Sequence, residues 1–204
     1  MEELQIENNY SFRELFNIKK TNIFWKTIDW LAYKLDYAAK IYDRTVGNEY
    51  RNEKKKFDLT KSKEILHIGC GSYPITAMVL AEIDGARVVT IDNDIRAVNR
   101  ANKVIKRKNL NGKIKIEYGK GTNYNLDKYD TIIVSGCSIP KIKVLEHVFK
   151  NAKSKSKIVA RYSSKDIDKI KNNIKPDQKI KIEKKITNHL FPNTTWDSFL
   201  ITKG

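Results

Sequence analysis

The stretch that decides the fold is EILHIGCGSYPITAMVLAE, residues 64–82. Its first part is a short apolar run and predicts a buried strand. Gly69 and Gly71 follow, and they allow a tight turn that brings backbone amides close to a ligand. From Pro74 onward the spacing is helical, and proline suits a first helical turn because its missing N–H needs no partner there. The stretch therefore predicts a strand, a glycine turn and a helix around a cofactor.

Strand-like and helix-like segments alternate along the rest of the chain. We expect further strands at 86–92, 113–118, 129–136 and 156–162, and helices at 94–108, 140–152 and 165–174. The last two runs, 178–187 and 194–203, have no helical segment between them, so they predict an antiparallel hairpin. This order predicts an α/β fold with a seven-stranded, mostly parallel sheet, the Rossmann-like class I methyltransferase fold.

The first sixty residues have a different pattern. An apolar or aromatic residue recurs every three or four positions, without strand-like alternation. We expect two helices, broken near residues 20–22 and ending before Gly47, which form a helical cover (1–60) in front of the cofactor domain (61–204). Four aromatic residues in this cover are expected to form its packing face, with a roof over the active site as the alternative. They are Trp25, Trp30, Tyr33 and Tyr37.

The composition limits the class of protein. The 204 residues carry a formal charge of +16, but the lysines are scattered along the whole chain. A solvated basic surface is therefore favoured over a nucleic-acid groove, which would also need interleaved aromatic residues. Cys70 and Cys137 are too few for a disulfide framework or a zinc site, and no metal is expected. With no apolar run of membrane-span length and a polar start, we expect a cytoplasmic protein without a membrane partner.

The identity of the cofactor depends on Asp92. It ends the second expected strand, twenty-one residues after Gly71, where a ribose-binding carboxylate belongs. A helix cap is the alternative interpretation. A dinucleotide loop needs a third glycine near the pyrophosphate, and residues 72–74 (Ser-Tyr-Pro) would obstruct that approach. S-adenosylmethionine has no phosphate, so we expect it as the co-substrate.

The other expected cofactor contacts follow the ends of the strands. The region after the third strand has no acid, so adenine is expected to be held by backbone groups at residues 120–122, with help from Asn123. The full set of expected cofactor-binding residues is Gly69, Cys70, Gly71, Ser72, Tyr73, Asp92, Asn93, Gly121, Thr122, Asn123, Ser135 and Gly136.

The loop and its helix, IGCGSYPITAMVLA (68–81), resemble those of the nicotianamine synthases. This family also lacks the acid that many related folds carry at the position of His67. Other segments are similar to the family's remaining motifs, so that the resemblance spans residues 47–203. They are NEYRNEKKKFDL (48–59), TIDNDIRAV (90–98), YDTIIVSG (129–136), LEHVFKNAKSKSKIVARYS (145–163) and FPNTTWDSFLITK (191–203).

The resemblance implies transfer of the aminocarboxypropyl group of S-adenosylmethionine to a small-molecule amine or amino acid. Methyl transfer to a small molecule is the alternative, followed by an RNA-modifying methyltransferase and a non-catalytic cofactor-binding module. Residues 135–140 read SGCSIP, without the Asn/Asp-Pro-Pro-aromatic signature of enzymes that methylate amino groups of nucleic acids. Members of the family carry a longer N-terminal helical domain, which leaves the substrate open.

The general base is expected from the helical cover: Glu49, Tyr50 or Glu53, with Asp36 and Asp43 further back. The same resemblance places a tyrosine-bearing segment before the first strand, which makes Tyr50 the best match. For Tyr50 a packing role weighs equally, and for Glu53 a solvated position is favoured. Cys137 has no nearby base and is not expected to be a nucleophile. We interpret His147 as a structural residue of its helix. His189 would line the edge of the pocket or cap the hairpin.

Overall fold

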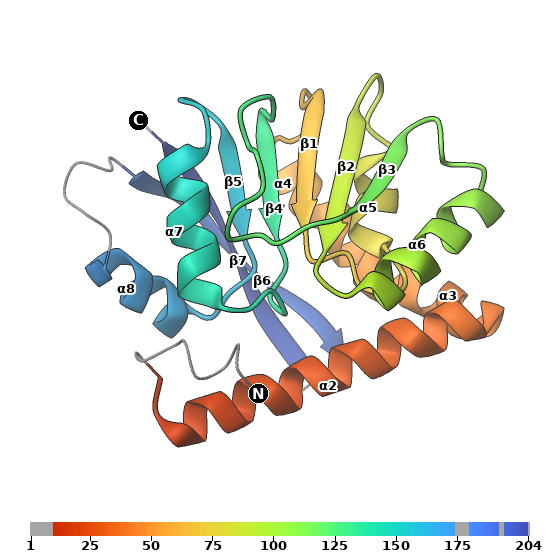
Figure 1. The fold of residues 1–204 in the computed structure, drawn as a ribbon, viewed down its shortest axis with the longest axis horizontal. Coiled ribbons are helices and arrows are strands. Elements are labelled where there is room, and N and C mark those ends of the chain that lie inside the picture. The colour runs from red at the N-terminus through yellow and green to blue at the C-terminus, as the bar shows by residue number, and fades with distance from the viewer. Residues whose placement is uncertain (1–9, 174–179, 192–193, 204) are drawn as a thin grey trace.

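The computed structural model describes residues 10–173, 180–191 and 194–203 (Figure 1). Its centre is a seven-stranded sheet with the order β3-β2-β1-β4-β5-β7-β6. Strands β1 to β5 are parallel, and β7 is antiparallel to both of its neighbours. The strands are β1 (Glu64–Ile68), β2 (Arg87–Asp92), β3 (Ile114–Tyr118), β4 (Thr131–Val134), β5 (Lys157–Ala160), β6 (Ile180–Phe191) and β7 (Thr194–Lys203). The expected class I methyltransferase fold is confirmed.

The helices are named in chain order. They are α2 (Phe12–Lys34), α3 (Asp36–Tyr42), the π-helical turn η1 (Asp43–Gly47), α4 (Asn48–Lys56), α5 (Ile75–Leu80), α6 (Ile95–Arg107), α7 (Lys141–Asn151) and α8 (Ser164–Asn173). No helix among the described residues is long and apolar enough to cross a membrane.

The strands are apolar because both faces of the sheet are covered. Every residue of β4 is buried, and successive side chains of β1 enter two different clusters. Leu66 and Ile68 pack with residues of α7 and α8, whereas Ile65 packs with residues of α5 and α6. The period of two along a strand thus divides the core into two layers of helices around one sheet.

The N-terminal cover differs from its sequence-based prediction. The break expected near residues 20–22 is wrong: α2 is continuous to Lys34, and the chain turns at Leu35, whose backbone is extended (φ −121°, ψ 117°). Residues 20–22 contain no glycine or proline, and Asn22 is buried with its amide donating to the carbonyl of Cys137. The helical region also continues through Gly47, which keeps helical angles (φ −60°, ψ −39°) and leads into α4.

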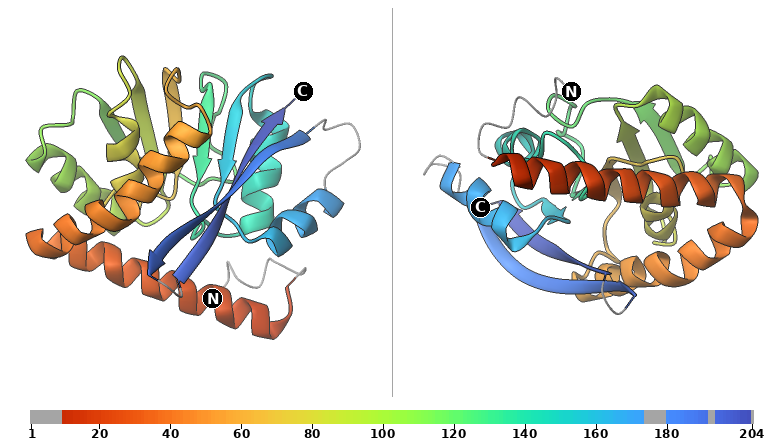
Figure 2. Two further views of the ribbon diagram at one scale, coloured as in Figure 1. Left: turned by 180° about the vertical axis from the view of Figure 1, so that it is seen from behind. Right: turned by 90° about the horizontal axis from the view of Figure 1, so that it is seen from below.

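The cover lies over the functional end of the sheet. Figure 1 shows α2 crossing below the carboxyl ends of the parallel strands, and the view from below in Figure 2 shows it as the outermost element on that side. Trp25 faces inward, whereas Trp30 is 42% exposed and Tyr37 77% exposed. The prediction that all four aromatic residues form one packing face is therefore wrong. Only one side of α2 is buried, and spacing alone did not identify it.

Candidate active site

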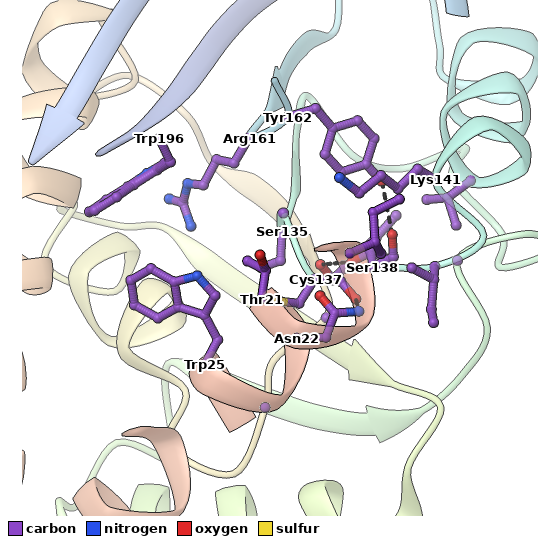
Figure 3. A pocket seen from close by; sticks show the side chains of 18 of the residues that line it. Thr21, Asn22, Trp25, Ser135, Cys137, Ser138, Lys141, Arg161, Tyr162 and Trp196 are labelled. Atoms are coloured by element: carbon purple, nitrogen blue, oxygen red, sulfur yellow. Dashed lines mark hydrogen bonds between the residues drawn. The ribbon is translucent and has the colours of Figure 1, made fainter. Parts of the chain in front are cut away.

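A cavity of about 750 Å³ lies between α2 and the carboxyl ends of the strands. In Figure 3, Thr21, Asn22 and Trp25 of α2 lie on one side of it, with Ser135, Cys137 and Ser138 opposite. Trp196 and Arg161 close one end, and Lys141 and Tyr162 lie toward the other. Loops after parallel strands meet α2 here, which is where ligands bind in open α/β sheets. The volume is in the range of small-molecule sites.

The glycine turn after β1 forms part of the wall. Gly69 and Gly71 have positive φ angles of 89° and 64°, a conformation that L side chains rarely adopt. A Cβ atom on Gly69 would stand 2.5 Å from Ser138 Oγ, and one on Gly71 would collide with the carboxylate of Asp29. Both glycines are therefore required by conformation and by the close approach of neighbouring elements.

Asp92 at the end of β2 braces this turn. Its Oδ2 accepts a hydrogen bond from the Gly71 amide and its Oδ1 accepts one from the Asp94 amide, both at 2.9 Å. Burial raises the pKa of the Asp92 carboxyl, and these two hydrogen bonds oppose that shift. The adjacent Asp94 caps α6 by accepting from the Arg96 amide, so the cap interpretation belongs to Asp94, while Asp92 lines the cavity.

Asp29 is a second carboxylate at the same turn, contributed by α2. Its Oδ1 accepts a hydrogen bond from the hydroxyl of Tyr42 at 3.0 Å, and the backbone of Ser72 also bonds to it. Burial, and to a lesser degree the nearby charge of Asp92, raise the pKa of Asp29 to about 8. The sequence analysis missed this residue. Its spacing of four and seven positions from Trp25 and Asn22 places the three residues on one side of α2, but the sequence does not show which side faces the sheet.

His67 is buried in β1 and connects to the cavity through Ser135. Its Nδ1 lies 2.9 Å from Thr90 Oγ1 and its Nε2 2.8 Å from Ser135 Oγ. Thr90 donates its single hydroxyl hydrogen to the carbonyl of His67, so Nδ1 is the protonated nitrogen and Nε2 accepts from Ser135. Burial, with a contribution from the charge of Arg161, lowers the pKa of His67 well below its ordinary value. His67 is thus a neutral imidazole that fixes the direction of the Ser135 hydroxyl.

An aromatic and cationic group closes one end of the cavity. The Arg161 guanidinium lies 3.6 Å from the ring centre of Tyr50, and Trp196 packs edge-on against both Tyr50 and Trp25. Arg161 also donates to the carboxylate of Glu53 and to the hydroxyl of Thr76. The Nε1 atom of Trp196 is buried and has no hydrogen-bond partner among the described residues.

The three candidate bases lie in different surroundings. Tyr50 lines the cavity, but burial raises its pKa to about 12. Glu53 is 2% exposed and paired with Arg161, so the expectation that it is a solvated residue is wrong. Glu49 lies outside the cavity lining, where its carboxylate accepts from the backbone amide of His189 at 3.4 Å. Only Tyr50 of the three reaches the cavity.

The opposite end of the cavity carries a buried ion pair that the sequence analysis missed. Lys141 Nζ lies 2.9 Å from Asp166 Oδ2, and Tyr10 donates its hydroxyl to Asp166 Oδ1. The ammonium of Lys141 also lies 5.1 Å from the ring centre of Tyr162. These residues come from distant segments of the chain, so local patterns could not bring them together.

The structure brings most of the expected cofactor-binding residues to the cavity. Ten of the twelve line it; the exceptions are Ser72 and Asn123. The Ser72 hydroxyl accepts from Arg100 instead, and Asn123 is exposed. Residues in the lining are Gly69, Cys70, Gly71, Tyr73, Asp92, Asn93, Gly121, Thr122, Ser135 and Gly136.

The remaining cysteine and histidine residues are Cys137, which lines the cavity, and His147 and His189, which lie outside its lining. Burial raises the pKa of Cys137 to about 12, which opposes a thiolate nucleophile. His147 bonds to the Tyr124 carbonyl and to Asn151, as expected of a structural residue. His189 lies within β6 opposite Thr195 and outside the cavity lining.

Comparisons with solved structures agree with this fold. Two structures of MtNAS are similar over nearly the whole chain at 15% identity. One is a mutant, with a TM-score of 0.72; the match covers 99% of this chain and 80% of the MtNAS chain. The other is in complex with MTA and tNA, with a TM-score of 0.68; the match covers 100% of this chain and 81% of the MtNAS chain. An O-methyltransferase from Bacillus cereus in complex with SAH is similar over 87% of this chain and 91% of its own (TM-score 0.62, 15% identity).

Sequence comparisons give the family. A search of curated proteins finds no match. The model of the methyltransferase small domain matches residues 51–155, which run from within α4 to the loop between α7 and β5. That segment contains the glycine turn, Asp92 and the loop after β4, and it makes up half of the chain. The chain belongs to the methyltransferase small domain family.

Proposed function

We propose that the protein is an S-adenosylmethionine-dependent transferase that moves the aminocarboxypropyl group of this co-substrate to a small-molecule amine or amino acid. The observation that carries the proposal is the pair of carboxylates at the glycine turn. Asp92 accepts from the Gly71 amide, and the carboxylate of Asp29 lies where a Cβ atom on Gly71 would stand. Each carboxyl has a raised pKa because little water reaches it.

Two enclosed carboxylates favour a cationic ligand. S-adenosylmethionine carries a sulfonium and an ammonium group, and its ribose hydroxyls can donate to Asp92. A cation between Asp29 and Asp92 would offset the cost of holding their charges away from water. A pyrophosphate would bring further negative charge to the same turn, so a dinucleotide suits this site poorly.

The residues of the cavity can place and deprotonate a nucleophile. Bound S-adenosylmethionine supplies an electrophilic sulfonium centre, and the carbon that faces the nucleophile is the one transferred. Asp29, with a pKa of about 8, is suited to accept a proton from an incoming amine near neutral pH. Tyr50 remains a candidate for this role from the sequence, but its pKa of about 12 suits a wall or hydrogen-bond donor better.

Similarity to MtNAS supports transfer of the larger group. The match includes α2 and its inner side, since it covers 99% of this chain, and one MtNAS structure is in complex with MTA and tNA. The chain also carries the nicotianamine synthase-like motif IGCGSYPITAMVLA (68–81). At 15% identity the similarity concerns the fold, so the choice of transferred group is a proposal.

Methyl transfer to a small molecule is the second candidate. It is favoured by the similarity to the O-methyltransferase from Bacillus cereus in complex with SAH, over 87% of this chain. The buried His67 and the hydroxyl of Ser135 would serve either reaction as part of the cavity wall.

The nucleoside by-product distinguishes the two reactions. The protein is incubated with S-adenosylmethionine and a panel of amines and amino acids, and nucleosides are separated by chromatography. Aminocarboxypropyl transfer leaves methylthioadenosine, whereas methyl transfer leaves S-adenosylhomocysteine. Methylthioadenosine that depends on the acceptor and is lost in Asp29→Asn supports the proposal. S-adenosylhomocysteine as the sole product would establish the methyltransferase instead.

A further inference from the structure

Exposed apolar side chains concentrate on α2 and α3. Nine of the eleven large hydrophobic residues that are exposed in the described chain lie between Phe12 and Ile41. Phe12 is 87% exposed and Phe16 61%. Isolated exposed hydrophobic residues are common, but a continuous group on one element indicates a contact surface.

These side chains share one side of α2. Phe12, Phe16, Ile23 and Trp30 follow one another at intervals of four, seven and seven residues, which places them in one stripe along the helix. The opposite side, with Asn22, Trp25 and Asp29, lines the cavity. We call the stripe, with the adjoining Phe24 and Leu31, the outer face of α2. Figure 2 shows from below that α2 is the outermost element there.

The basic and acidic side chains of α2 lie on different sides of the helix. Basic side chains border the outer face, and none of them forms an ion pair with an acid among the described residues. They are Arg13, Lys19, Lys20 and Lys34. The two acids of the helix point elsewhere: Glu14 pairs with Lys165 and Lys169, and Asp29 lies at the glycine turn. The outer face is thus apolar and cationic, and neither of the two acids of α2 lies on it.

We propose that the outer face of α2 docks on the surface of an anionic lipid bilayer. Aromatic and aliphatic side chains flanked by lysines suit the boundary between headgroups and acyl chains, and lysines bind anionic headgroups. A second copy of the chain would bring lysines against lysines, between molecules that each carry +16. RNA would use the lysines but leave Phe12, Phe16 and Ile23 without a role. The sequence predicts no membrane partner because no apolar run reaches the length of a membrane span, and docking of a helix on a bilayer surface needs no such run.

The test uses co-sedimentation of the full chain with vesicles. One set is phosphatidylcholine alone, and the other is phosphatidylcholine mixed with phosphatidylglycerol. The wild type is expected to sediment with the anionic vesicles only, and less at high salt because the charges are screened. The double variant Phe12→Ser, Phe16→Ser and the double variant Lys19→Glu, Lys20→Glu are each expected to lose roughly tenfold or more of this binding.

Matched controls separate the outer face from general charge and hydrophobicity. Ile95→Ser with Tyr118→Ser removes two other exposed apolar side chains, 52% and 54% exposed, and Lys106→Glu with Lys108→Glu makes the same change of charge at the C-terminal end of α6. Both controls are expected to bind vesicles as the wild type does, and circular dichroism checks that every variant is folded.

Three results would overturn the proposal. The first is the absence of binding to anionic vesicles, or an equal loss of binding in the control variants. The second is a concentration-dependent dimer in sedimentation velocity that the Phe12→Ser, Phe16→Ser variant loses, because the face would then bind a second copy. The third is RNA binding in place of vesicle binding, lost in the Lys19→Glu, Lys20→Glu variant.

Discussion

The guanidinium of Arg161 binds the carboxylate of Glu53 through two hydrogen bonds, 2.7 and 3.1 Å long, inside the protein. Their side chains are 3% and 2% exposed. The pair joins the end of β5 to α4, so it attaches the helical cover to the sheet beside the cavity. Removing one partner would leave a buried charge without compensation.

Replacing Glu53 should therefore unfold the protein more readily. Glu53→Gln keeps the shape but not the charge, and the free energy of unfolding in urea is expected to fall by about 3–5 kcal/mol. Glu64→Gln is the matched control, since Glu64 pairs with Arg87, whose side chain is 79% exposed, and exposed pairs contribute at most about 1 kcal/mol. Equal losses in the two variants would contradict the structural role of the Arg161 pair.

Asp92 should contribute to cofactor affinity. Asp92→Ala removes the proposed acceptor for the ribose hydroxyls and the hydrogen bond to the Gly71 amide. Hydrogen bonds to a charged group contribute about 1.5–3 kcal/mol each, so we expect S-adenosylmethionine binding to weaken at least tenfold in calorimetry. In Asp94→Ala, which loses the cap of α6, stability should decrease while affinity stays close to that of the wild type. Unchanged affinity in Asp92→Ala would remove Asp92 from the binding site.

The ionisation of Asp29 should set the pH dependence of the reaction. A general base acts when it is deprotonated, so kcat/KM for S-adenosylmethionine, which reports the free enzyme, is expected to rise with pH and level off above about 8, the pKa of Asp29. Asp29→Asn should abolish turnover while the fold is retained. A wild-type kcat/KM that levels off well below this pH would argue against Asp29 as the base.

The ionisation of Asp29 should also affect the free energy of unfolding, which is expected to fall with rising pH while the reaction rate increases. The pKa of Asp29 is raised from 3.8 to about 8 in the folded protein, so the folded state binds the proton more tightly than the unfolded state does. The contribution of this group is fully present below about pH 4 and is lost as the pH rises through about 8. The difference in unfolding free energy between the wild type and Asp29→Asn, measured in urea from pH 4 to pH 9, should follow this curve. A constant difference would contradict the assigned shift.

A side chain at Gly71 should disturb both the turn and the cover. Gly71→Ala forces an L residue to a φ of 64°, which costs about 1–2 kcal/mol, and its Cβ would collide with Asp29. We expect lower stability and weaker cofactor binding. A Cβ at Gly112 meets nothing within 4 Å, so Gly112→Ala should leave both measurements close to the wild type. Wild-type binding by Gly71→Ala would show that the turn does not need glycine.

The parts of the fold that could be predicted from sequence depend on local pattern. The strand, turn and helix of residues 64–82 follow from apolar spacing and two glycines. Asp92 was found because its distance from Gly71 along the chain is fixed by one βαβ unit. The terminal hairpin was visible because no helical segment separates its two strands.

The parts that could not be predicted depend on contacts between distant segments. Asp29 reaches Gly71 only because α2 crosses the strand ends with one particular side inward, and helical spacing does not specify that side. Arg161 and Glu53 are separated by 108 residues, and His67 and Ser135 by 68. The helix break at Leu35 had no glycine or proline to indicate it.

The position of β7 between β5 and β6 has a consequence for the order of folding. Strands β3, β2, β1, β4 and β5 can pair as soon as they have been synthesised, because each parallel neighbour precedes residue 161. Among the described residues β6 pairs only with β7, so it has no place on the sheet until residues 194–203 have been synthesised. Trp196, which closes the cavity beside Arg161, arrives with that last strand. Before β7 is synthesised, the edge of β5 is therefore unpaired and the cavity is open. Pairing of β7 with β5 covers this edge and brings Trp196 to the cavity in one step.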